Sequence, residues 1–174
     1  MLRSIDLYVV LKLAVSSKEQ TYEALASALS LSPSQVHRSV KSAQQSGLVG
    51  VSKHDVHRKA LRDLAVHGVR YVYPAQRGAE TRGVPTAHAA PPLKHVLTSA
   101  GLPLVWPSAT GTMRGEALTP LYKHAPKAIQ GDPHFYEVLA LVDALRVGRA
   151  RDQKLAGQLL TERLVQRRGT EARG

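Results

Sequence analysis

Residues 21–49 read TYEALASALSLSPSQVHRSVKSAQQSGLV, and this stretch decides the fold that the sequence predicts. Thr21 is a suitable N-cap for a short helix over residues 22–29. The apolar side chains of that helix recur at α-helical spacing, and a three-residue turn, residues 30–32, follows it.

The second helix of this stretch carries clear start and stop signals. Ser32 is the predicted N-cap, Pro33 takes the first helical position, and Gln35 completes a Ser-x-x-Gln capping box. The helix is expected to run to about Ser46 and to stop at Gly47, which suits a left-handed cap. The stretch therefore predicts two helices joined by a short turn.

The two sides of the second helix differ in chemistry. Val36, Val40 and Ala43 recur at spacings of four and three, which predicts an inward apolar stripe. The remaining side chains are hydrogen-bonding or cationic, without a carboxylate: Ser34, Gln35, His37, Arg38, Lys41, Ser42 and Gln45. An α-helix fits the major groove of B-DNA, so this side is a candidate DNA-binding surface. The alternative is an ordinary solvated helix in a three-helix core.

Side-chain chemistry suggests a role for each of the main candidates. Gln35 can pair with adenine, and Arg38 can bond guanine through two hydrogen bonds. Lys41 lies one turn further on and is expected to contact phosphate. Ser32 and Ser34, with the free backbone N–H groups at the helix start, also suit a phosphate oxygen.

The same stretch resembles the helix-turn-helix of bacterial winged-helix regulators of the MarR-like superfamily. The resemblance rests on the caps, on Ala26 where two helices approach, on Leu31 in the turn, and on the exit Ser-Gly-Leu-Val at residues 46–49. It implies a winged helix-turn-helix protein that binds double-stranded DNA. It also implies a transcriptional repressor, which covers a promoter and hinders polymerase.

A β-hairpin wing is expected after the helix-turn-helix. Residues 69–73 are β-prone, a loop follows at residues 76–83, and residues 84–89 could form the returning strand. Arg77 and Arg82 would lie near the tip and contact DNA, because arginine is favoured in the minor groove. The alternative is a flexible loop with two incidental arginines.

Two more helices are expected around this region. Residues 4–15 predict a mostly buried core helix, and residues 55–67 predict a helix between the exit and the wing. Many MarR-like proteins place the wing almost directly after this exit, so the intervening helix departs from the common pattern.

The C-terminal part reads as a pair of helices. Asp132 and Pro133 predict the start of an apolar helix that ends at about Val147, and a last helix follows at residues 149–168. Their apolar side chains are more than such a pair can hide by itself. They must pack on the first helix, on a second subunit or on another protein, and a homodimer is the expected case.

The middle of the chain predicts no long helix. Residues 74–133 hold nine of the ten prolines and six of the thirteen glycines. Trp106, the only tryptophan, lies in this region. It is interpreted as a packing anchor between the two halves, with a docking site for a partner protein as the alternative.

Composition narrows the classes of function. The 174 residues include 24 Lys plus Arg against 13 Asp plus Glu, a net charge of +11, which favours a polyanionic partner. Residues 33–82 contribute nine of the basic and three of the acidic side chains. The absence of cysteine excludes disulfides and thiolate sites. The chain has no apolar run of about 18 residues and no leader-like N-terminus, so a cytoplasmic protein without a membrane span is expected.

No motif predicts catalysis. The chain has no phosphate-binding glycine loop that ends in Lys-Ser/Thr, no nucleophile elbow and no His-Glu-x-x-His pattern. His54 and His57 are three residues apart, but no further ligand is suitably spaced. We therefore expect no enzyme, no cofactor and no metal.

The sequence thus predicts a mainly α protein with a small β-hairpin, of the α+β class. The expected domains are a winged helix-turn-helix at residues 1–92, a Pro/Gly-rich connector at 93–131 and a helical dimerisation or partner-binding region at 132–174. The predicted function is a sequence-specific DNA-binding transcriptional regulator that acts as a dimer. The alternative is a DNA-binding antitoxin or adaptor whose C-terminal half binds a partner protein.

Overall fold

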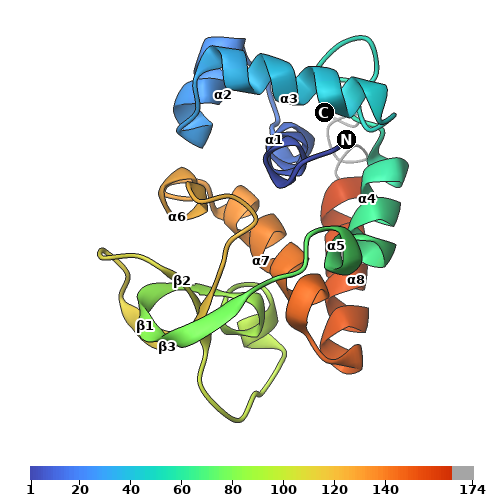
Figure 1. Cartoon of the computed structure of the whole chain (residues 1–174). Coiled ribbons are helices and arrows are strands. Elements are labelled where there is room, and N and C mark those ends of the chain that lie inside the picture. The colour runs from blue at the N-terminus through green and yellow to red at the C-terminus, as the bar shows by residue number, and fades with distance from the viewer. Residues whose placement is uncertain (166–174) are drawn as a thin grey trace, which may run out of the picture.

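The computed structural model describes residues 1–165, and Figure 1 shows their arrangement. The chain combines helices with one small sheet, so the predicted α+β class is confirmed. The elements in chain order are α1 (Ser4–Val15), α2 (Tyr22–Leu29), α3 (Pro33–Gln45), α4 (Arg58–His67), α5 (Val69–Val72), β1 (Arg77–Thr86), η1 (Ala87–Ala89), η2 (Leu93–His95), β2 (Leu104–Pro107), β3 (Met113–Leu118), α6 (Ala125–Ala128), α7 (Pro133–Val147) and α8 (Ala150–Val165).

The N-terminal helices follow the sequence closely. Thr21 caps α2 by accepting a hydrogen bond from the backbone N–H of Ala24, and α1 and α2 have the predicted bounds. Helix α3 packs against both α1 and α2. Helix α1 is buried on nearly all sides, from Asp6 to Val15, as its apolar sequence predicts. Figure 1 shows α2 and α3 together at one end of the molecule, with α1 beneath them.

Helix α7 forms the centre of the molecule. Its start at Pro133 and its end at Val147 are as predicted, and Asp132 caps it by accepting from the N–H of Phe135 at 3.0 Å. It packs against α1, α4, α5, α8, η1 and β1, and its residues from Val138 to Arg146 are all buried. The last predicted helix begins at Ala150, and its expected end, residues 166–168, lies outside the described residues.

Most apolar side chains of the C-terminal helices are therefore covered by the same chain, whereas Leu155 and Leu159 are partly exposed and Val165 is 43% exposed. Of the three coverings expected from the sequence, packing on the first helix occurs, and α4, α5 and the sheet complete it. A homodimer is expected only if a large apolar surface of these helices stays uncovered. The homodimer stays a prediction without that support.

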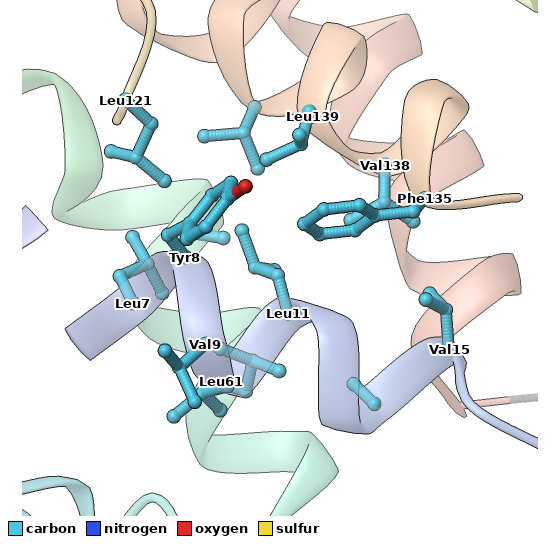
Figure 2. Packing of buried hydrophobic residues seen from close by; sticks show 14 of the residues in the cluster. Leu7, Tyr8, Val9, Leu11, Val15, Leu61, Leu121, Phe135, Val138 and Leu139 are labelled. Carbon is cyan, nitrogen blue, oxygen red and sulfur yellow. The ribbon is translucent and has the colours of Figure 1, made fainter. Parts of the chain in front are cut away.

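Aromatic packing joins α1 to α7 across the core (Figure 2). The ring of Tyr8 lies 5.4 Å from that of Phe135 and 5.2 Å from that of Tyr122, measured between centroids. Its hydroxyl donates a 3.2 Å hydrogen bond to the carbonyl of Leu29. One continuous cluster of buried side chains extends in this way from α1 to α8.

The sheet has three strands that close into a ring. Strand β1 pairs antiparallel with both of the others, and β2 pairs in parallel with β3. A Cβ atom on Gly83 would overlap the carbonyl oxygen of Trp106, and one on Gly115 would overlap that of Pro103. Glycine at these two positions therefore lets the strands approach this closely.

A buried carboxylate fastens the sheet to α7. Asp143 accepts hydrogen bonds from the hydroxyl of Thr86 at 2.6 Å, from the indole N–H of Trp106 at 2.7 Å and from the guanidinium of Arg146 at 2.8 Å. The Trp106 ring also lies 5.9 Å from that of Tyr136 on α7. Trp106 is 1% exposed, so its interpretation as a packing anchor is confirmed and the docking alternative is wrong.

The predicted wing is wrong in its local structure. Residues 69–72 form α5, a helical turn that packs against α7 with Val69 buried, so tertiary packing overrides their β propensity. Residues 77–83, expected to be a loop, belong to strand β1. The partners of β1 lie in the segment 93–131, which was expected to be a connector and instead contains β2, β3 and α6. Such non-local pairing has no local signal in the sequence.

Candidate nucleic-acid interface

The start of α3 is built by the predicted capping box. The backbone N–H of Gln35 donates to the hydroxyl of Ser32 at 3.2 Å, and the N–H of Ser32 donates to the Gln35 side-chain oxygen at 2.9 Å. Pro33 occupies the first turn. The predicted inward stripe is also confirmed, because Val36, Val40 and Ala43 are at most 1% exposed. The other side of α3 is thereby turned to solvent.

The outward side of α3 is cationic and polar. Its exposed members are Ser34, His37, Arg38, Lys41 and Gln45, with Gln35 and Ser42 partly exposed. The helix contains no carboxylate. Within residues 1–165, neither Arg38 nor Lys41 has an ion-pair or hydrogen-bond partner. Other cations are neutralised internally, for example Arg163 by Glu137 at 2.8 Å.

The capping box changes what Gln35 can offer to a base. A bidentate contact to adenine needs the side-chain oxygen as an acceptor as well as the amide nitrogen as a donor. That oxygen already accepts from Ser32. The Ser32 and Ser34 hydroxyls also bond each other at 3.1 Å. This places Arg38 ahead of Gln35 as the base-reading candidate.

A cluster that the sequence analysis missed borders the first half of α3. The ring of Tyr22 on α2 lies 5.3 Å from that of His37, and the ammonium of Lys53 lies 4.9 Å from the Tyr22 ring centroid. Helical spacing alone places Tyr22 among the apolar side chains of its helix, and no sequence motif includes Lys53. A tyrosine one position after an N-cap lies at the solvent end of a helix, which is the signal that could have identified it.

A tight hairpin follows α3 directly. Val49 and Val56 form an antiparallel β-bridge, and the Gly50 N–H donates to the Asp55 carbonyl at 2.7 Å. The Gln44 side-chain amide holds the hairpin to α3 by donating to the carbonyls of Gly50 and Val51, at 2.8 and 2.9 Å. The sequence signal for this hairpin is a pair of β-branched residues, Val49 and Val56. They flank the Gly-Val-Ser-Lys-His-Asp stretch of residues 50–55.

Arg77 and Arg82 lie elsewhere. Both belong to β1, and Figure 1 shows the sheet at the end of the molecule opposite to α2 and α3. Arg77 is held by Glu116 at 3.1 Å. The structure therefore brings together the predicted residues of α3 and separates them from these two arginines.

The histidine pair lies beside the hairpin without forming a ligand set. The Nδ1 atom of His57 donates to the Gly47 carbonyl at 2.7 Å, and its Nε2 atom lies 3.9 Å from the Asp55 carboxylate. Across the described part of the chain, no three His, Asp or Glu side chains gather around one point.

Comparisons with protein-family models, curated proteins and solved structures found no match for the chain. Within residues 1–165, no helix combines the length and hydropathy that a membrane span needs.

Proposed function

We propose that this protein is a sequence-specific double-stranded DNA-binding transcriptional regulator with α3 as its recognition helix. The observation that carries the proposal is the outward side of α3, where Arg38 and Lys41 are exposed and unpaired within residues 1–165 on a helix without a carboxylate. A polyanion such as DNA would supply the negative charge that Arg38 and Lys41 do not find within residues 1–165. The width of an α-helix also matches that of the major groove.

The hairpin at residues 49–56 is the proposed second contact, in place of the wing expected from the sequence. It lies directly after α3, and Gln44 fastens it there. Its tip carries Lys53, whose ammonium lies over the ring of Tyr22 beside His37. Helix and hairpin thus form one cationic surface. Bound to a promoter, the protein would act by occlusion, as a MarR-like repressor does.

The function is tested with the full chain and a pool of genomic fragments, from which bound sequences are selected at low salt. Arg38→Ala should weaken binding to a selected site by about 1–3 kcal/mol and change binding to random duplex little, because a bidentate guanine contact is lost. Lys41→Ala should weaken binding to both and lower the salt slope by about one unit, because one phosphate contact is lost.

Lys154→Ala is the matched control, since this exposed lysine of α8 lies outside the proposed surface and carries the same charge. It should leave both affinities at the level of the unmodified protein. A protein that enriches no fragment, or an Arg38→Ala variant that binds a selected site normally, would overturn the assignment of α3.

A further inference from the structure

A cavity of about 360 Å³ lies far from α3, where the sheet meets the turn between α7 and α8. Its walls come from β1, η1, β2, β3, the loop at residues 98–102 and the helices on either side of Gly148. Small-molecule sites typically have volumes of about 300–1,000 Å³ and combine an apolar lining with a few polar groups. This cavity has the size and the mixed lining of such a site.

Part of the lining is apolar. Ala87, Leu104 and Ala144 line the cavity and are at most 3% exposed, so they belong to the packed interior. Leu102 also lines it and is 55% exposed. The apolar part of a ligand would cover Leu102 and the small free surface that Leu104 presents.

The charged lining is left with one positive charge in excess. Three guanidinium groups, from Arg77, Arg149 and Arg151, face two carboxylates, from Glu116 and Asp152. Arg77 bonds Glu116 at 3.1 Å, and Arg151 lies 3.5 Å from Asp152. Arg149 has no ion-pair partner within residues 1–165. An anionic group on a ligand would offset this excess charge.

His88 adds a polar group without a second positive charge. It lines the cavity and is half-buried, and burial lowers its pKa below the ordinary value, with Arg77 acting in the same direction and Asp152 against it. The imidazole is therefore neutral near pH 7, where it can either donate or accept one hydrogen bond.

We propose that this cavity binds a small organic anion, with an apolar body over Leu102 and Leu104 and a carboxylate or phosphate group bonded to Arg149. The unpaired guanidinium favours an anion over neutral or cationic molecules, Leu102 favours an apolar body, and His88 can add one hydrogen bond. The site does not depend on whether α3 binds DNA.

The test uses three probes with the same ring: benzoate, phenyl phosphate and benzyl alcohol. Amide chemical shifts of the full, isotope-labelled chain are followed during titration of each probe to high millimolar concentration. At least one anionic probe should shift the amides of His88, Leu102 and Arg149, while benzyl alcohol should bind at least about tenfold more weakly. A charge-assisted hydrogen bond contributes about 1.5–3 kcal/mol, and 1.4 kcal/mol corresponds to tenfold.

The same titrations show which anionic group the cavity binds and whether Arg149 bonds to it. A response to benzoate alone assigns a carboxylate ligand, and a response to phenyl phosphate alone assigns a phosphate. Arg149→Gln should weaken the binding of that probe at least about tenfold, because this exposed side chain supplies the unpaired charge. Lys154→Gln removes a charge from α8, which begins directly after Arg149, at a position outside the cavity, and should leave binding unchanged.

Three results would overturn the proposal. The first is the absence of shifts at the lining residues with both anionic probes. The second is binding of benzyl alcohol as tight as that of the anions. The third is an Arg149→Gln variant that binds the responsive probe like the unmodified chain.

Discussion

Arg38 and Ser39 are neighbours on α3, and neither side chain has a hydrogen-bond partner within residues 1–165. The consequences for stability differ, because one side chain is exposed and the other is buried. The Arg38 guanidinium is unpaired within residues 1–165 but exposed, so water solvates it. The Ser39 side chain is completely buried, and its hydroxyl has no hydrogen-bond partner in the described structure. A buried hydroxyl without a hydrogen-bond partner lowers the stability of the fold by about 1–3 kcal/mol. A charge that water solvates carries no such penalty. Exposure therefore makes Arg38 available for binding, whereas burial makes Ser39 a weak point of the fold.

Ser39→Ala should raise the free energy of unfolding by about 1 kcal/mol or more, since it removes the unmet hydroxyl and improves helix propensity. Urea denaturation of the full chain measures this change. Ser27→Ala on α2 is the control, because Ser27 is exposed and its replacement should yield only the propensity gain of about 0.5 kcal/mol. A Ser39→Ala variant no more stable than the control would contradict the assigned cost.

At the scale of elements, local signals determine which parts could be predicted. Caps and apolar periodicity identify the bounds of α1, α2 and α7, and they identify the outward side of α3. The sheet could not be predicted, because β1 pairs with strands distant in sequence, and α5 forms where β-prone residues pack on α7. The hairpin at residues 49–56 was missed because one β-bridge leaves only a short pattern.

The attachment of this hairpin to α3 gives an element-scale prediction. Gln44→Ala removes both hydrogen bonds to the hairpin, so the protection of the Gly50 amide against hydrogen exchange should fall by about fivefold or more, corresponding to about 1 kcal/mol of local stability. Gln45→Ala changes an exposed neighbour that has no such bond and should leave Gly50 protected. Equal protection in the two variants would show that the hairpin is stable without Gln44.

At the scale of the whole molecule, the hydrophobic core extends across the domain boundaries predicted at residues 92 and 131. One buried cluster includes side chains from α1, α3, the sheet and α8. Arg58 connects the two ends of this cluster by donating hydrogen bonds to the carbonyls of Ala14 on α1 and Leu164 on α8, each at 2.8 Å. The N-terminal helices therefore have no core that is separate from the C-terminal half.

The full chain should accordingly unfold in one transition. Fluorescence of Trp106 reports the sheet and far-UV circular dichroism reports the helices, and the two urea midpoints should coincide. A fragment of residues 1–92 should lack a cooperative transition, because it exposes the side of α1 that packs on α7. Two separate urea midpoints, or cooperative unfolding of the fragment, would instead support the domain boundaries predicted from the sequence.

The ring of three strands bears on how this protein meets others. An open sheet presents unpaired backbone N–H and C=O groups to any extended peptide, and such edges are where strand addition and fibril growth begin. Here each strand pairs with both of the others, but over part of its length: β1 pairs with β3 through residues 77–83 and with β2 through residues 83–86. The paired stretches are closed to strand addition, so a binding partner that meets them must recognise side chains rather than extend the ladder.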